Sequence, residues 1–280
     1  MHESPARRPT TPARVRVVDG DTARERPDRL VTEEPMEIRV EGPGQPAAPV
    51  TVTMRTPGHD FELAVGFCVS EHVVAGADDV ATVAYCLAGE GHQEYNVVTV
   101  RTRVPVDLEQ HRRNFVSNSS CGLCGKTTLD QVEAACAPVT SDLRVTAAAL
   151  TSMPDALRDA QAVFGATGAV HATGCFTADG ELRVVREDVG RHNALDKVIG
   201  WAALSGALPL RDAVSIVSGR VSFEIVQKAA TAGIPVVGAV SAPSSLAVQT
   251  AHRLGVTLIG FLRGERFNVY THPERVVLSA

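Results

Sequence analysis

The sequence lacks any long apolar run and any large excess of charge of one sign. A membrane-spanning helix needs about 20 consecutive apolar residues, and the 280-residue chain contains no such run. The formal net charge is -5, so no overall basic field indicates nucleic-acid binding. The basic N-terminal residues are not followed by the apolar stretch of a secretory signal. We therefore expect a cytoplasmic protein that binds neither membranes nor nucleic acids.

A disulfide framework and the common nucleotide-binding fingerprints are also missing. Six cysteines are spread along the chain, and only Cys121 and Cys124 lie close together. In a reducing compartment such a C-x-x-C pair is more often catalytic or metal-binding than structural. Neither G-x-x-x-x-G-K-[ST] nor G-x-G-x-x-G follows a predicted strand of the C-terminal half. The other thiols lie in apolar or helical contexts and are expected in the core: Cys68, Cys86, Cys136 and Cys175.

Hydrophobic patterns divide the chain into three parts. Residues 1–30 are rich in proline and arginine, and we predict a disordered tail. Residues 31–140 are predicted to form an α+β domain that ends in the C-x-x-C loop. Its elements are a β-hairpin over 35–58, a helix over 59–74 capped by Asp60, a strand over 95–104 and a helix over 127–136.

Residues 141–280 are predicted to form an α/β domain. One or two helices are expected within 142–168, a hairpin turns at Asp179-Gly180, and a helix covers 190–206. Apolar strands then alternate with helices that end at Gly233 and Gly255, which is typical of a parallel sheet covered on both faces. The strands are 213–219, 234–241 and 256–263, and the helices are 222–233 and 244–255.

Three polar segments follow these strands, and parallel strands place them on one edge of the sheet. They are Ser218-Gly219-Arg220, the serine-rich stretch 241–245 and Arg263-Gly264-Glu265-Arg266. Arginine and free backbone N–H groups at helix starts favour an anion, so we expect a phosphate-bearing ligand here. The structural alternative is that the serines cap helices and the arginines are solvated.

Several ionisable residues surround the predicted start of the 190–206 helix. In "REDVGRHN", Asp188 is a candidate helix cap, while His192 is a candidate acid, base or phosphate ligand, or none of these. We expect the imidazole of His171 to be buried and hydrogen-bonded.

The cysteine pair allows three interpretations. A zinc deaminase combines H-x-E with P-C-x-x-C, and His92-Gln93-Glu94 precedes the pair, but Ser120 replaces the proline. Thioredoxin-like dithiol exchange would need the pair after the first strand of a βαβ unit, whereas it follows a polar "SNSS" stretch. A sulfur relay needs a reactive thiolate, and nearby cations such as Arg113 and Lys126 lower a thiol pKa.

Six motifs together resemble the formate dehydrogenase accessory sulfurtransferases, the FdhD family. They are "MRTPGHDFELAVGF", "SSCGLCGK", "FGATGAVHATG", "REDVGRHNALDKVIG", "SGRVSFEIVQKAATAGIPVVGAVSAPSSLAV" and "TLIGFLRGERFNVY". The resemblance runs from about residue 35 to the C-terminus and follows the order of the family's motifs.

The resemblance implies a sulfur carrier and sulfurtransferase. A cysteine desulfurase would load Cys121 as a persulfide beside its partner Cys124. The sulfur would pass to the bis-molybdopterin guanine dinucleotide form of the molybdenum cofactor, for formate dehydrogenase. The family's cofactor-binding segment maps onto Phe261-Leu262-Arg263-Gly264-Glu265-Arg266. The resemblance also implies a homodimer and a C-terminal domain of cytidine-deaminase type without zinc or another resident metal. A chaperone that binds the cofactor without moving sulfur is a further alternative.

Overall fold

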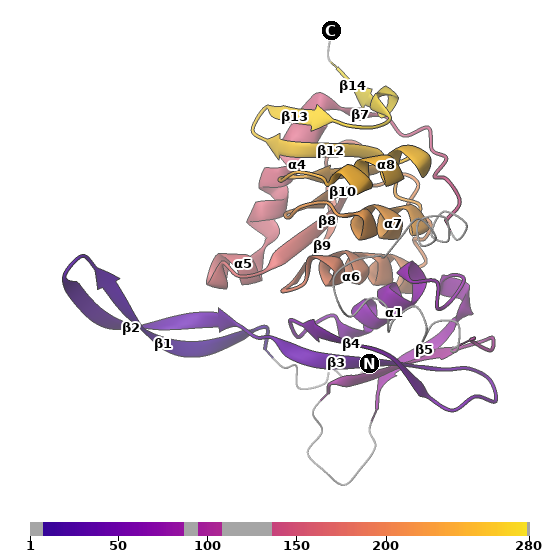
Figure 1. Cartoon of the computed structure of the whole chain (residues 1–280), viewed down its shortest axis with the longest axis horizontal. Helices are drawn as coiled ribbons and strands as arrows, with labels where there is room; N and C mark the ends of the chain where they lie inside the picture. The colour runs from indigo at the N-terminus through magenta and orange to yellow at the C-terminus, as the bar shows by residue number, and fades with distance from the viewer. Residues whose placement is uncertain (1–7, 87–94, 108–135, 279–280) are drawn as a thin grey trace.

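A computed structural model describes residues 8–86, 95–107 and 136–278 of the chain. It is a mixed α/β structure with a four-stranded sheet near the N-terminus and a six-stranded sheet formed by the C-terminal half (Figure 1). The predicted helix over 127–136 lies outside the described residues except for Cys136. None of the helices in the described ranges is long and apolar enough to span a bilayer.

The N-terminal sheet has the strand order β4-β3-β6-β5. Met36, Ile38 and Val40 alternate along β3 and are buried beneath helix α1, because every second side chain of a strand points to the same face. The bounds are β3 (Glu34–Glu41), β4 (Ala48–Arg55), α1 (Asp60–Ser70), the 3₁₀ turn η1 (Ala77–Asp79), β5 (Val80–Tyr85) and β6 (Val97–Thr102). The predicted hairpin, helix and strand of this region are confirmed.

Asp60 has a different role from the predicted helix cap. The N-cap of α1 is His59, and no side chain caps this helix start. The Asp60 carboxylate instead accepts a hydrogen bond from Arg55 Nη2 at 2.9 Å and one from the Tyr85 hydroxyl at 3.1 Å. Arg55 and Asp60 are both buried, and a buried guanidinium without an acid partner would be costly. This ion pair fixes the start of α1 to the sheet.

The six-stranded sheet has the order β13-β12-β11-β10-β8-β9, with β10, β11 and β12 parallel. The predicted alternation of strands and helices from residue 213 is confirmed. The bounds are β8 (His171–Phe176), β9 (Leu182–Asp188), α6 (Arg191–Leu204), β10 (Val214–Val217), α7 (Phe223–Thr231), β11 (Val236–Ala239), α8 (Ser245–Arg253), β12 (Thr257–Arg263) and β13 (Arg266–Val269). Gly233 and Gly255 follow α7 and α8 with φ of 78° and 69°, as expected for residues that end helices.

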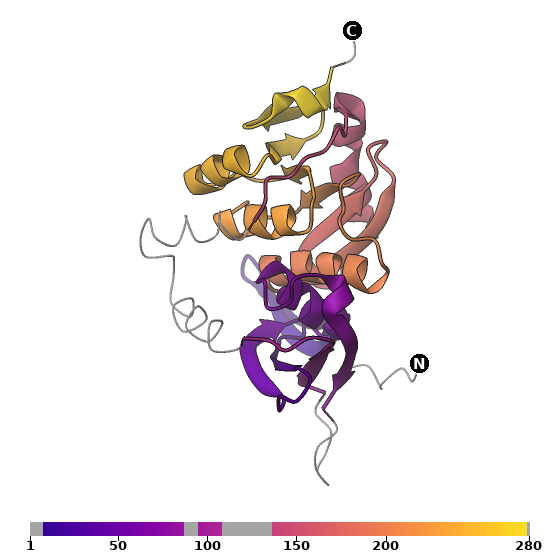
Figure 2. The ribbon, with the colours of Figure 1, turned by 90° about the vertical axis from the view of Figure 1, so that its right-hand side faces the viewer.

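Helices cover both faces of this sheet (Figures 1 and 2). One face packs on α4 (Ala147–Ala160), where Leu150, Met153 and Leu157 are buried against β8 and β10, and α5 (Ala162–Thr167) follows. The other face packs on α6, α7 and α8. The short parallel pair of β7 (Val145–Thr146) and β14 (Val276–Val277), preceded by the 3₁₀ turn η2 (Pro273–Arg275), closes the C-terminal end.

The predicted disordered tail is wrong for residues 10–31. Strands β1 (Thr10–Asp19) and β2 (Thr22–Val31) form an antiparallel hairpin that extends from the body of the protein (Figure 1). Gly20, with φ of 56°, lies in the two-residue turn, and such turns require positive φ. Valine alternates with arginine along β1, and Arg16 lies opposite Glu25, so the arginine-rich composition conceals a strand pattern.

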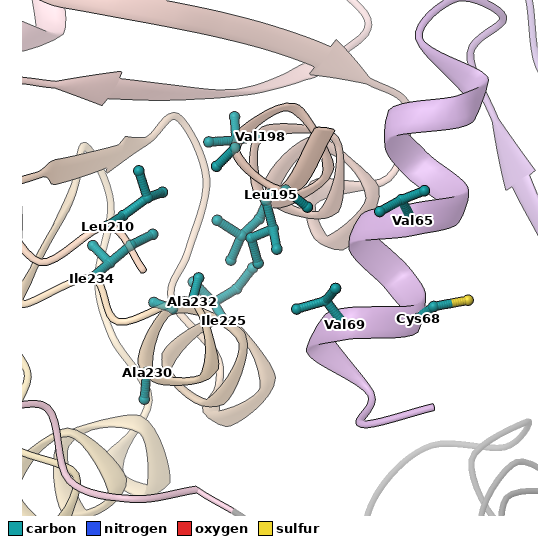
Figure 3. Packing of buried hydrophobic residues seen from close by; sticks show 14 of the residues in the cluster. Val65, Cys68, Val69, Leu195, Val198, Leu210, Ile225, Ala230, Ala232 and Ile234 are labelled. Carbon is teal, nitrogen blue, oxygen red and sulfur yellow. The ribbon is translucent and has the colours of Figure 1, made fainter. Parts of the chain in front are cut away.

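The two sheets are joined by close packing of α1 on α6 (Figure 3). A Cβ added at Gly66 would lie 1.8 Å from the Asp196 carbonyl oxygen, and one at Gly200 would lie 1.8 Å from the Glu62 carbonyl oxygen. The helix backbones therefore touch where these glycines face the opposite helix. Val65 and Val69 of α1 and Leu195 and Val198 of α6 belong to one hydrophobic core that continues across the junction.

An ion pair and a buried hydrogen bond cross the same junction. Lys197 on α6 lies 2.7 Å from Asp188 Oδ2 and donates to the Thr56 carbonyl at 2.9 Å. Arg186 Nη2 donates to Glu62 Oε1 of α1 at 2.7 Å. Because Arg186 and Glu62 belong to different sheet units, separating the units would leave these two charges without each other, and Lys197 would lose the Thr56 carbonyl.

The Glu62 carboxylate makes the junction sensitive to acid. Burial alone would raise the pKa of Glu62, but hydrogen bonds from Arg186 and His59 lower it below its ordinary value. A lowered carboxyl pKa in the folded state gives stability that is present above the unfolded pKa of about 4.3 and is lost as the pH falls through the folded pKa.

We expect Glu62→Gln to lower the free energy of unfolding by about 1–3 kcal/mol at pH 7. We also expect it to reduce the loss of stability of the wild type between about pH 5 and pH 3. Urea unfolding at several pH values measures both effects. Glu181→Gln, at an exposed position, is the control. An unchanged acid profile in Glu62→Gln would show that this ion pair does not contribute.

Candidate functional site

The cysteine pair itself lies outside the described residues. Cys121, Cys124, Lys126, His92 and Glu94 all fall in the undescribed ranges, so the zinc, dithiol and sulfur-relay interpretations have no geometry here. Within the described ranges, no group of three or more His, Cys, Asp or Glu side chains is placed to hold a metal ion.

The described chain resumes after the cysteine pair at Cys136, which is firmly held. Its Sγ lies 3.3 Å from His72 Nε2, just beyond α1, and 3.1 Å from Thr231 Oγ1 at the end of α7. Cys136 is 3% exposed, and burial raises the pKa of its thiol. A buried, protonated thiol is a poor nucleophile, so Cys136 fastens this part of the chain to the α1–α7 junction.

Two other thiols are core residues as predicted. Cys68 and Cys175 are fully buried, and burial raises their pKa values to about 12 and about 11. Cys86, at the end of β5, is only half-buried, so the prediction of a core position is wrong there. The raised pKa values make Cys68 and Cys175 unreactive thiols at neutral pH.

The three polar segments meet at the carboxyl edge of the sheet, as the sequence predicts. The Phe261 N–H donates to the Ser241 carbonyl at 3.0 Å, and Arg263 Nε donates to the Val240 carbonyl at 2.8 Å. A bridge between Val221 and Pro243 joins the segments that follow β10 and β11. Two hydrogen bonds and a β-bridge therefore hold the ends of β10, β11 and β12 in one continuous rim.

Two of the rim serines serve the fold. Ser244 is the N-cap of α8, and its side chain accepts from the Ala247 N–H at 3.2 Å. Ser218 Oγ accepts from the Ala172 N–H at 2.9 Å, which ties the end of β10 to β8. For both hydroxyls the structural alternative to ligand binding therefore holds, because each stabilises the fold.

The segment Phe261–Arg266 forms the outer part of the rim. Phe261 is 43% exposed and has φ of 55°, next to a break in the register of β12 and β13. This conformation is rare for an aromatic residue and costs about 1–3 kcal/mol, and it leaves the ring accessible at the surface. Arg263 and Arg266 are exposed as well, whereas the Leu262 side chain is fully buried. Of these six predicted site residues, Leu262 can therefore offer a ligand only its backbone.

The acidic residues of "REDVGRHN" stabilise the fold. Glu187 accepts from the N–H groups of Val163 and Phe164 at 2.9 and 2.8 Å, which caps α5. Asp188 is fully buried and accepts from the Gly190 N–H at 2.8 Å. Gly190, and not Asp188, is the N-cap residue of α6, so the predicted helix cap becomes the buried partner of Lys197 described above.

The two histidines of the rim differ in their partners. His192 Nε2 lies 2.9 Å from Glu224 Oε2 and 3.2 Å from Ser222 Oγ, and this contact lowers the pKa of Glu224. His171 is half-buried. The ring has no hydrogen-bond partner among the described residues, and its partial exposure differs from the predicted buried position. Burial and the nearby Arg191 charge lower the pKa of His171.

One group of residues was not predicted to lie together. A Cβ placed on Gly219 would be 3.2 Å from His171 Nδ1 and 4.0 Å from Arg191 Cδ. His171 is brought to the end of β10 by the antiparallel pairing of β8 with β10. A long connection separates β8 from β10 in the sequence, so hydrophobic periodicity does not indicate that they pair. The one sequence feature that points to this group is that Arg191 and Gly219 both lie at the ends of predicted elements.

Comparisons with known proteins place the chain in a family. The model of the FdhD/NarQ family matches residues 31–277. The chain is 51% identical over 273 residues to "Sulfur carrier protein FdhD" of Streptomyces avermitilis, covering 95% of each chain. It is 50% identical over 277 residues to the protein of the same name from Mycobacterium tuberculosis, covering 95% of this chain and 98% of the other.

A solved structure has the same fold. It is a crystal structure of a protein from Desulfotalea psychrophila, described there as a formate dehydrogenase accessory protein, with a TM-score of 0.77 and 24% sequence identity. The superposition covers 96% of this chain and all of the other. Since the family model spans nearly the whole sequence and the relatives match along almost their full length, the chain belongs to the FdhD/NarQ family.

Proposed function

We propose that this protein is a sulfurtransferase that accepts persulfide sulfur from a cysteine desulfurase on Cys121. It passes that sulfur to the bis-molybdopterin guanine dinucleotide molybdenum cofactor used by formate dehydrogenase. The main support is the Cys121/Cys124 pair in a chain that is 51% identical over 95% of its length to a protein named as a sulfur carrier. A cytoplasmic homodimer and a cytidine-deaminase-type C-terminal fold belong to the same proposal.

Sulfur loading is a thiol–persulfide exchange. The Cys121 thiolate attacks the terminal sulfur of the desulfurase persulfide, the donor S–S bond breaks, and a new S–S bond forms on Cys121. The desulfurase thiolate leaves and takes up the proton that Cys121 released, so the step is redox-neutral. Arg113 and Lys126 lie near the pair in sequence, and positive charge favours the thiolate. Cys124 is the adjacent thiol in the exchange.

The acceptor binds at the rim of the six-stranded sheet. Arg263 and Arg266 are exposed there, and arginine forms forked hydrogen bonds with phosphate oxygens. The exposed Phe261 ring offers an apolar face on which a guanine base can stack. The molybdenum cofactor is the substrate of the transfer, and the protein holds its nucleotide portion while sulfur is delivered.

Intact mass after incubation with a desulfurase and cysteine tests this proposal. We expect the wild type to gain the mass of added sulfur, and Cys121→Ala to lose this adduct. Cys175→Ala is the matched control, because it removes a fully buried thiol whose pKa is raised, and it should load like the wild type. Full loading of Cys121→Ala would remove Cys121 from its role.

A further inference from the structure

We propose that His171, Arg191 and Gly219 form a second anion-binding subsite on the rim, which takes a phosphate or pyrophosphate group. This inference rests on the proposed function, because the guanine dinucleotide is the ligand that supplies such groups. The subsite lies at the junction of β8, β10 and α6, and it is separate from Phe261–Arg266 on β12 and β13.

Arg191 is a partly buried cation at the start of α6. No carboxylate lies within ion-pair distance of it among the described residues, although Asp188 is only three positions earlier. The Asp188 carboxylate is occupied by Lys197, by the Gly190 N–H and by Asn193 Nδ2. Arg191 Nε is buried and has no hydrogen-bond partner in the described structure. Partly buried arginines are normally paired, so this guanidinium has the capacity to neutralise an anion.

His171 adds an unused hydrogen-bonding group beside this charge. Its ring is half-buried, and its pKa is lowered by burial and by Arg191. The imidazole is therefore neutral near pH 7 and presents one N–H donor. His192 is the other imidazole near the rim, and its Nε2 lies 2.9 Å from Glu224 Oε2 at the start of α7.

Gly219 lies against both side chains. A methyl group at this position would lie 3.2 Å from His171 Nδ1, which is tighter than ordinary van der Waals contact, and 4.0 Å from Arg191 Cδ. Because glycine has no side chain, the His171 ring keeps its position and the backbone at residue 219 stays free of a side chain.

The N-termini of the neighbouring helices α6 and α7 also favour a negatively charged ligand. Neither Gly190 at the start of α6 nor Ser222 at the start of α7 provides a side-chain cap, and the Ser222 hydroxyl contacts His192 instead. Their first backbone N–H groups are therefore not satisfied by caps, and the positive ends of both helix dipoles favour an anion.

Two anion subsites on one rim suit a ligand with two dinucleotide arms. β10 and β12 are separated by one strand, β11, which corresponds to about 10 Å between the two strand ends. The Arg191 subsite and the Arg263/Arg266 segment can thus each hold one pyrophosphate of a bis-dinucleotide.

Binding of inorganic pyrophosphate, measured by isothermal titration calorimetry on the full chain, tests the second subsite. We expect Arg191→Gln to weaken pyrophosphate binding about 10- to 100-fold, the loss typical of removing charge-assisted hydrogen bonds. Gly219→Ala should weaken it as well, because its methyl group enters the space beside His171. Arg183→Gln is the matched control, since Arg183 pairs with Asp212 near the other end of β9, and it should bind like the wild type.

Thermal unfolding establishes that each variant is folded. If Arg191→Gln does not fold, pyrophosphate binding by Gly219→Ala tests the subsite in its place. The Arg263/Arg266 segment would still bind pyrophosphate, so unchanged affinity together with unchanged stoichiometry in a folded Arg191→Gln would overturn the subsite, as would equal weakening by Arg183→Gln. The sulfur-loading experiment uses the wild type and Cys121→Ala alone, so its failure would reject the proposed function without changing the pyrophosphate result.

Discussion

Gly200→Ala is expected to destabilise the protein by more than about 3 kcal/mol, at the upper end for overpacked cores. The added methyl carbon would lie 1.8 Å from the Glu62 carbonyl oxygen and 2.5 Å from its carbonyl carbon. These are backbone atoms of α1, so no side-chain rotation relieves the clash. The helices would have to move apart, and the contacts of Val65 and Val69 with α6 would weaken. Domains of this kind have net free energies of unfolding of about 5–15 kcal/mol, so the substitution would remove a large part of the net stability.

Urea unfolding of soluble protein measures this effect, and loss of soluble protein on expression would be its extreme form. Gly165→Ala is the matched control, because Gly165 lies in α5 and a Cβ there meets no atom within 4 Å. That substitution should stabilise the helix by about 0.5–1 kcal/mol. Wild-type stability of Gly200→Ala would mean that α1 and α6 are not in backbone contact.

Asp196→Ala is expected to cost about 3–5 kcal/mol, the loss typical when one partner of a buried ion pair is removed. Lys228 is 4% exposed and its ammonium lies 3.0 Å from both Asp196 carboxylate oxygens, 2.6 Å from Glu71 Oε1 and 2.8 Å from Ser70 Oγ. Burial alone would lower the pKa of Lys228, but the two carboxylates raise it. The ammonium therefore stays charged, and without Asp196 it would be only partly compensated.

Chemical denaturation at pH 7 checks this value. The double variant Asp196→Leu with Lys228→Met removes both charges and should recover most of the lost stability, since an apolar pair of similar volume often replaces a buried ion pair at little cost. Asp212→Ala breaks the exposed pair with Arg183 and should cost less than about 1 kcal/mol. If Asp196→Ala behaves like Asp212→Ala, the buried pair does not hold α6 to α7.

The strands and helices after residue 213 could be predicted because local sequence determines them. Apolar runs bounded by glycine and polar residues describe buried parallel strands whatever their partners are. The hairpin over 10–31 was missed because proline and arginine dominated its composition. Pro12 and Pro27 are tolerated there, since each strand of an isolated two-stranded ribbon has one edge free of hydrogen bonds.

The features that could not be predicted depend on contacts between residues far apart in the sequence. The sequence offers no reason for glycine at positions 66 and 200 within helices, and only the packing of α1 on α6 explains them. At the rim, the arginines and the loop glycines were visible in the motifs. The place of His171 beside Gly219 was not, because it depends on the pairing of β8 with β10. The positive φ of Phe261 likewise follows from the break in register at the end of β12.

The shared core of α1 and α6 limits how the two sheet units can move relative to each other. The described chain leaves one sheet unit after β6 and re-enters at Cys136, which is clamped between His72 and Thr231. Both attachment points belong to a single block, since the Arg186–Glu62 ion pair and the contact of α1 with α6 join its halves. We therefore expect no domain closure between the two sheet units. In the proposed sulfur transfer, donor and acceptor would bind to and leave a body whose two sheet units keep their relative positions.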